Sequence, residues 1–279
     1  MKLTQHYRNI LLHEWLWIAL LLIMLLRTAI HHSILWSSVV CLFLISTLIN
    51  TTVKKRIYRF GFYIVLMNTL FVLLKYISPI INPNGKKDAL LYQLDCALFG
   101  DFVGLITNYF SPLWLTEIFA FFYLLFLPQL LFFFIYFLIK KDLTQRFYTG
   151  LMTLYAFGFM GYIFIPAIGP YDFLVDKLNV NLQGYLFYYL LNENYAKGSN
   201  LTDVFPSLHC GVSCFILLFN AKFDPKQFKI WFVPTLLLWI STVYLHYHYL
   251  IDCIVGIALA ILCFMISLKG KKNGSINIQ

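Results

Sequence analysis

Long apolar runs alternate with short polar connections along almost the whole chain. A helix needs roughly 20 mostly apolar residues to cross a lipid bilayer, and eight stretches of the sequence approach that length. They cover residues 10–27, 33–50, 59–80, 114–139, 147–168, 206–220, 230–246 and 249–268. The sixth stretch is short and the last two nearly touch. The pattern therefore predicts an all-α integral membrane protein, a polytopic helix bundle of about six to eight transmembrane helices.

Composition and the placement of charge agree with a membrane protein. Hydrophobic residues make up 61% of the 279 residues and charged residues only 12%, far from the balance of a soluble domain. Fifteen of the 21 lysines and arginines fall in alternate connections, counted from the N-terminus: Lys2, Arg8, Lys54, Lys55, Arg56, Arg59, Lys140, Lys141, Arg146, Lys222, Lys226, Lys229, Lys269, Lys271 and Lys272. The positive-inside rule therefore predicts that both termini are cytoplasmic. Because this bias accounts for the net charge of +9, we expect no nucleic-acid partner.

Two long connections, about 82–113 and 169–205, fall on the opposite, non-cytoplasmic side of the predicted membrane. Long loops carry function more often than short ones do. The first connection contains an amphipathic sequence, DALLYQLDCALFG, which would lie along the membrane interface rather than cross it. Cys96, Cys210 and Cys253 also lie toward this side, where free cysteine is the default and a disulfide is the alternative.

The sixth apolar stretch begins with a polar group, in the sequence VFPSLHCG. Pro206 suits the first position of a helix, where its missing N–H costs nothing. Ser207 and His209 then follow where free backbone N–H groups and the positive end of the helix dipole favour an anion. A merely solvated histidine at a helix end is the alternative interpretation.

The last apolar stretch begins with a second polar group, in the sequence YLHYHYLID. His248 and Asp252 are four residues apart and would share one face of a helix. A carboxylate beside a histidine fixes its tautomer and stabilises its charged form, which leaves the other ring nitrogen free as a nucleophile or base. A structural pair that closes a helix end is the alternative. The predicted topology favours function, because it brings this pair to the same membrane face as His209, as metal-free phosphoryl transfer would need.

At these residues the sequence resembles the phosphatidic acid phosphatase type 2 superfamily of membrane phosphatases and phosphotransferases. The second motif of the superfamily is Pro-Ser-Gly-His, and the third is Ser-Arg, five residues, His, three residues, Asp. Here PSLH is followed 39 positions after its histidine by His248, and Ser241 and Thr242 stand where the third motif has Ser-Arg. FPSLH and YLHYHYLID are closer to the inositol phosphorylceramide synthase (inositolphosphotransferase) branch, which also lacks that arginine. LDCALFG and IPAIGP resemble upstream segments of the same branch, so the likeness covers about Asp95 to Gly256.

The resemblance implies a role for each matching residue. His248 would be the nucleophile that forms a phosphohistidine, and Asp252 would orient it and stabilise its charge. His209 would be the acid for the leaving group and then the base for the acceptor, while Ser207 would hold phosphate oxygens. The first motif of the superfamily, which carries a lysine and an arginine, is absent, since PAIGPYD stands in its place. The candidate cations for phosphate are therefore Lys75, Lys177 and Lys197.

The expected function is a metal-independent lipid phosphatase or phosphotransferase that uses no cofactor. Its substrate would be a phospholipid or lipid phosphate ester. The ester would be cleaved on the periplasmic, exterior or luminal side, and its phosphoryl group would be transferred to water or to an alcohol or polyol. The expected domains are N-terminal transmembrane helices in 1–80, a catalytic membrane domain in 81–268, and a cytoplasmic tail in 269–279.

Two other interpretations remain open at this point. A non-enzymatic lipid-binding or lipid-transport protein on the same fold would explain the missing cations, but it would not need both histidines. A metal site of His246, His248 and Asp252 is disfavoured, because residues two apart on a helix point in different directions. His246 is therefore expected to be an interfacial side chain. The sequence does not indicate an oligomeric state.

Overall fold

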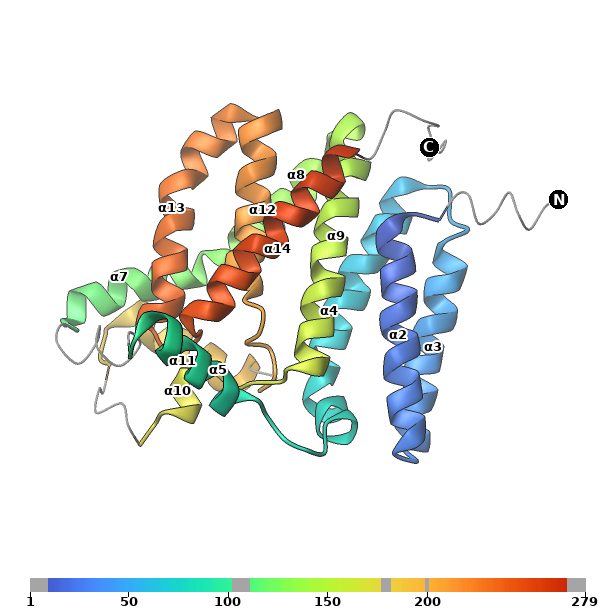
Figure 1. Cartoon of the computed structure of the whole chain (residues 1–279). Helices are drawn as coiled ribbons and strands as arrows, with labels where there is room; N and C mark the ends of the chain where they lie inside the picture. Colours follow the sequence, from blue (N-terminus) through green and yellow to red (C-terminus); the bar gives the residue numbers. More distant parts are fainter. Residues whose placement is uncertain (1–9, 102–110, 177–181, 199–200, 270–279) are drawn as a thin grey trace.

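Helices make up nearly the whole of the computed structural model, which describes residues 10–101, 111–176, 182–198 and 201–269 (Figure 1). For residues 194–198 it describes the backbone only. The helices are α2 (Leu12–Ile30), α3 (Ile34–Asn50), α4 (Arg56–Ile81), α5 (Asp88–Phe99), α7 (Leu113–Leu124), α8 (Phe126–Ile139), α9 (Lys141–Phe164), α10 (Pro170–Phe173), α11 (Leu186–Gly198), α12 (Leu208–Phe223), α13 (Pro225–Tyr244) and α14 (Leu250–Lys269).

Each of the eight apolar stretches in the sequence corresponds to helix, with α7 and α8 forming one run that is interrupted at Leu125. Within the described residues, five helices are long and apolar enough to cross a membrane: α2, α4, the α7–α8 run, α9 and α14. The helices α3 and α12 are apolar but shorter. The prediction of an all-α polytopic membrane protein is confirmed.

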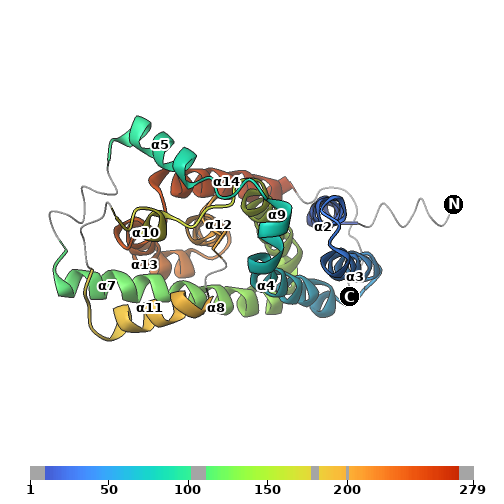
Figure 2. The same ribbon diagram turned by 90° about the horizontal axis from the view of Figure 1, so that it is seen from below.

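The bundle has an N-terminal side and a C-terminal side, which meet along α4 and α9 (Figure 1). On the N-terminal side, α2 and α3 form a hairpin that packs on α9 and α4. On the C-terminal side, α12 lies at the centre and contacts α8, α9, α13 and α14. The short helices α5, α10 and α11 gather at the end of the bundle where α12 and α14 begin (Figures 1 and 2).

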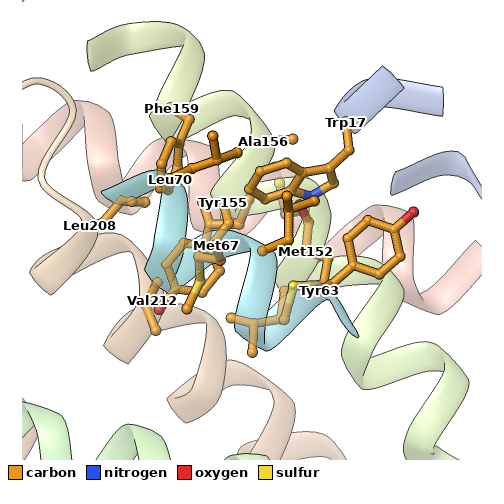
Figure 3. Packing of buried hydrophobic residues seen from close by; sticks show 14 of the residues in the cluster. Trp17, Tyr63, Met67, Leu70, Met152, Tyr155, Ala156, Phe159, Leu208 and Val212 are labelled. Atoms are coloured by element: carbon orange, nitrogen blue, oxygen red, sulfur yellow. The ribbon is translucent and has the colours of Figure 1, made fainter. Parts of the chain in front are cut away.

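A continuous apolar core joins the two sides of the bundle. Figure 3 shows Met67 of α4 among Tyr155 of α9 and Leu208 of α12, and all three side chains are buried. Trp17 of α2 is fully buried in the same cluster, and its indole N–H donates to the carbonyl oxygen of Met152 at 3.0 Å. The N-terminal helices are therefore packed onto the half of the chain that carries the sequence motifs.

A buried ion pair also ties α2 to α4. Arg59 lies with its guanidinium nitrogens 2.7 Å and 2.6 Å from the two carboxylate oxygens of Glu14, and both side chains are almost fully buried. This two-pronged geometry is the strong form of an arginine–carboxylate pair. Arg59, grouped above with the loop cations, thus has a partner inside the bundle.

Candidate active site

The first turn of α12 carries two of the predicted site residues. Ser207 is the N-cap of this helix, and its hydroxyl accepts the N–H of Cys210 at 3.3 Å. Serine is favoured at this position because its side-chain oxygen satisfies one of the free N–H groups of the first turn. The prediction that Pro206 occupies the first helical position is wrong, because the helix begins two residues later and Pro206 precedes the cap. His209 lies within the first turn.

His248 lies in the turn between α13 and α14 rather than on a helix. The prediction that His248 and Asp252 share one helix face is therefore wrong, since only Asp252 is in α14. The turn is built on the carbonyl oxygen of Thr242, which accepts the N–H groups of both Tyr247 and His248 at 3.1 Å. Asp252 reaches back over the start of its own helix and accepts the N–H of Tyr249 at 3.0 Å. His248 is thus held by backbone contacts on both sides.

The two helix starts bring the histidines and the carboxylate together. His209 Nδ1 lies 3.3 Å from His248 Nε2, and His248 Nδ1 lies 3.5 Å from Asp252 Oδ2. The backbone fixes the same arrangement, because the N–H of Ser207 donates to the carbonyl oxygen of Asp252 at 3.1 Å. The result is a row of three side chains in which each ring nitrogen of His248 faces a different neighbour. The side chains of His248 and Asp252 are buried, and that of His209 is half-buried.

Close approach of α12 and α14 makes this row possible, and it depends on a glycine. A Cβ atom placed on Gly256 would overlap the carbonyl oxygen of Ser207. On the facing helix, a Cβ atom on Gly211 would lie 3.0 Å from the carbonyl oxygen of Gly256. Any larger residue at position 256 would therefore push the two helix starts, and the histidines with them, apart.

Two carboxylates of α5 brace the segments that surround the row. Asp95 accepts the N–H groups of Leu250 and Ile251, the first residues of α14, at 3.2 Å and 2.8 Å. Asp88 accepts the N–H of Gly169 at 2.9 Å and the hydroxyl of Tyr249 at 3.2 Å. Burial raises the pKa of both carboxyl groups, and the backbone N–H groups partly oppose this rise.

The sequence IPAIGP forms the loop between these braces and the histidine turn. Gly169 has a φ of +89°, and a Cβ atom there would lie 2.6 Å from the carbonyl oxygen of Tyr247, so only glycine fits. The N–H of Tyr171 donates to the carbonyl oxygen of His246 at 2.7 Å. The turn that carries His248 is therefore fixed from this side too. His246 itself is only 2% exposed, so the prediction that it is an interfacial side chain is wrong.

The surroundings of His248 set its protonation. Burial lowers the pKa of His248 below its usual value, and the neighbouring His209 lowers it further. The imidazole is therefore neutral near pH 7. With Asp252 facing Nδ1, the proton belongs on Nδ1 and the lone pair on Nε2, which points at His209.

Of the three predicted phosphate-binding lysines, only Lys75 has a described side chain. Lys75 is an exposed residue of α4 and does not line the cavity beside His209. Lys177 lies outside the described residues, and Lys197 belongs to α11, where the side chain is not described. The position of the superfamily's third-motif arginine is taken by Thr242, whose hydroxyl is buried and lies 3.3 Å from the sulfur of Cys253.

Asp203 is a residue near the site that the motif search missed. It precedes the PSLH segment, pairs through its backbone with Ala167, and lines the same cavity as His209. Burial raises the pKa of Asp203 to about 6. An acidic residue six positions before the histidine, in a chain with few acids, was the signal available in the sequence.

The described cysteines, Cys41 and the five that follow it, are all free thiols. Over the described ranges, no three histidine, cysteine, aspartate or glutamate side chains gather closely enough to hold a metal ion. The chemical groups that meet at the helix starts are two imidazoles, a carboxylate, a serine hydroxyl and backbone N–H groups. Such a set can attack, protonate and bind a phosphate ester.

The fold and this site define a helical membrane protein with a histidine–histidine–aspartate row at one end of its bundle. The sequence model of the PAP2 superfamily matches residues 89–266, well over half of the chain. The chain belongs to the PAP2 superfamily. This match confirms the superfamily inferred from the motifs; the closer branch is not settled by it.

One curated relative agrees with this assignment over a shorter stretch. A PA-phosphatase related-family protein of Dictyostelium discoideum is 30% identical over 109 residues, which make up 37% of this chain. The alignment covers only 19% of that relative. No solved structure matches the chain.

Proposed function

We propose that this chain is a membrane lipid phosphatase or phosphotransferase that works through a phosphohistidine on His248. The observation that carries the proposal is the row in which His209, His248 and Asp252 lie 3.3 Å and 3.5 Å apart at the starts of α12 and α14. Superfamily membership supports a phosphatase-type activity on a lipid phosphate. The site supplies a nucleophile, a proton donor and an orienting carboxylate, and each acts in one step.

In the first half of the reaction, the lone pair of His248 Nε2 attacks phosphorus. The new P–N bond forms as the P–O bond to the lipid alcohol breaks, and the leaving oxygen takes a proton from His209. Asp252 stabilises the positive charge that His248 acquires. Because Asp252 is fixed by the N–H of Tyr249, it holds the ring in one orientation throughout.

In the second half, an acceptor hydroxyl attacks the phosphohistidine and gives its proton to His209. The P–N bond breaks and His248 returns to its neutral form. Water as the acceptor makes the enzyme a phosphatase, and an alcohol or polyol makes it a phosphotransferase. The likeness of FPSLH and YLHYHYLID to the inositol phosphorylceramide synthase branch favours transfer.

Phosphate oxygens would bind at the N-terminal turn of α12, where Ser207 is the N-cap and the backbone N–H of His209 lies within the first turn. A helix start offers both N–H donors and the positive end of the dipole to an anion. Lys75, Lys177 and Lys197 remain the candidates for additional positive charge. The catalytic unit would be residues 81–268, preceded by the N-terminal helices in 1–80 and followed by the tail in 269–279.

The site would face the periplasm, the exterior or the lumen, with both termini in the cytoplasm. The basis is the charge bias of the connections, since the histidines fall at the end opposite the clustered cations. A cysteine introduced at Lys197 should react with an impermeant maleimide added outside intact cells, and one introduced at Lys226 should not. Labelling at position 226 alone would reverse the orientation.

The activity is tested with the full chain in lipid nanodiscs and a panel of phospholipids labelled in the phosphate. Release of inorganic phosphate and formation of new phosphodiesters are measured separately, with and without added polyol. We expect turnover by the wild type and by His31→Ala, a control histidine exposed on the α2–α3 turn, and none by His248→Ala. Equal turnover by all three proteins would remove the proposal.

A further inference from the structure

A cavity of about 140 Å³ lies directly beside His209, between α4, α8, α9 and α12. Its inner end includes His209, Asp203 and Tyr162, none of which is exposed, and His209 belongs to the proposed catalytic row. Its walls are apolar and largely aromatic, and they include Phe126 and Phe159. One cavity thus joins an apolar channel to the residue that we assign to leaving-group protonation.

The other end of the cavity opens on the outer surface of the bundle. Leu127 of α8 lines it and is 66% exposed, and Asn68 of α4 lines it and is also exposed. Both residues lie inside helices long enough to cross the membrane, so the surface around them faces lipid. The opening is therefore turned toward the bilayer rather than toward water.

The helix α4 forms one wall of this cavity, although it lies outside residues 89–266, which match the superfamily. Figure 3 shows Met67 of α4 beside Tyr155 of α9, and both residues line the cavity together with Phe159. Leu70 of α4 is fully buried in the same core cluster. The N-terminal helices thus help to form a space that reaches the catalytic row.

We propose that this cavity holds a hydrocarbon chain of the substrate, which reaches His209 sideways from the bilayer between α4 and α8, and that α4 limits which chains fit. This inference rests on the proposed function. A hydrocarbon chain suits the apolar walls, because each methylene group that leaves water for an apolar surface adds to the affinity. The polar inner end then meets the phosphate ester at the point where the chain is joined to it.

The test narrows the opening from each side and pairs each change with a control. On α8, Leu127→Trp places a large ring at the opening, whereas Leu131→Trp alters a residue that is 61% exposed but does not line the cavity. On α4, Asn68→Trp is paired in the same way with Val72→Trp, at a position that is 63% exposed. All four side chains are exposed, so the substitutions do not disturb the core.

Two substrates are compared for each variant in nanodiscs: a long-chain phospholipid, and a water-soluble nitrophenyl phosphate that has no chain. We expect the ratio of kcat/KM for the lipid to kcat/KM for the nitrophenyl ester to fall about tenfold in Leu127→Trp and Asn68→Trp. That is the affinity supplied by about two buried methylene groups. The ratio should stay within about twofold of the wild type in both control variants.

An unchanged ratio in both opening variants, or an equal fall in the controls, would overturn the inference. A fall with Leu127→Trp alone would remove the role of α4. The outcome is separable from failure of the proposed function, because in that case the wild type itself would turn over neither substrate.

Discussion

Asp95 is predicted to control both the stability and the activity of the protein, although it lies outside the proposed catalytic row. Its buried carboxylate accepts the first two N–H groups of α14 at 3.2 Å and 2.8 Å. Hydrogen bonds to a charged group contribute about 1.5–3 kcal/mol each, and loss of a helix cap costs about 0.5–2 kcal/mol. Since these contributions overlap, we expect Asp95→Ala to lower the free energy of unfolding by about 2–4 kcal/mol.

The same substitution should reduce turnover, because the first turn of α14 carries Asp252 and adjoins His248. A misplacement of about 1 Å can cost on the order of 10²-fold in rate, so we expect kcat to fall at least about tenfold with a smaller change in KM. Stability is measured by tryptophan fluorescence during denaturant unfolding in detergent, and activity in nanodiscs below the unfolding midpoint. Asp95→Asn keeps one oxygen acceptor and should recover part of both losses.

The control for Asp95 is Asp101→Ala, because Asp101 follows the same helix, is exposed, and interacts with Tyr92 at 3.3 Å. That variant should change the free energy of unfolding by less than about 0.5 kcal/mol. If Asp95→Ala matched Asp101→Ala in both stability and turnover, the bracing role of α5 would be refuted.

Three further predictions concern the chemistry of the site. His209→Ala should lose about 10²–10⁴-fold on a phospholipid but far less on a nitrophenyl phosphate ester, whose leaving group needs little protonation; equal losses would mean that His209 only positions phosphate. Asp203 has its pKa raised to about 6, so it is neutral below that pH and charged above it. The KM for a phosphodiester substrate should therefore rise as pH increases through about 6, and Asp203→Asn should flatten this rise; an unaltered profile would contradict it. Turnover should also survive EDTA, since the proposed steps use histidine and helix-start donors, and restoration by zinc, manganese or magnesium after loss would contradict the mechanism.

Much of the fold follows from the sequence because the bilayer imposes a simple length rule. A membrane-spanning helix must satisfy its own backbone and present about 20 apolar residues, so the apolar runs located every long helix. The residues of the candidate site could be predicted from the sequence for a related reason. His209, His248 and Asp252 are polar groups at the ends of apolar helices, where an ionisable side chain is costly and therefore informative.

The rest could not be predicted because it depends on contacts between segments far apart in the chain. Asp88 and Asp95 appear in the sequence as two acids on one face of an amphipathic helix, and nothing local indicates that they accept N–H groups of residues 168–169 and 250–251. The sequence around Glu14 and Arg59 likewise does not indicate that these two side chains form an ion pair.

The starts of α12 and α14 were also predicted incorrectly, and this changed the expected geometry around Pro206 and His248. A spacing of four residues predicted a shared helix face for His248 and Asp252. The chain instead turns between α13 and α14, so the pair meets across a helix start. In this chain the two side chains come close across the helix start, as they would on a shared helix face. The prediction therefore placed the residues together for the wrong reason.

The central claim is that His248 becomes covalently phosphorylated during turnover. The most direct measurement is rapid quenching of the full chain with a phosphate-labelled lipid under alkaline conditions, which preserve phosphohistidine, followed by peptide mass spectrometry. The account predicts phosphate on the peptide that contains His248 in the wild type, more of it in His209→Ala with the nitrophenyl ester, and none in His248→Ala. Turnover by the wild type with no phosphopeptide, or with the phosphate on a different residue, would contradict the account.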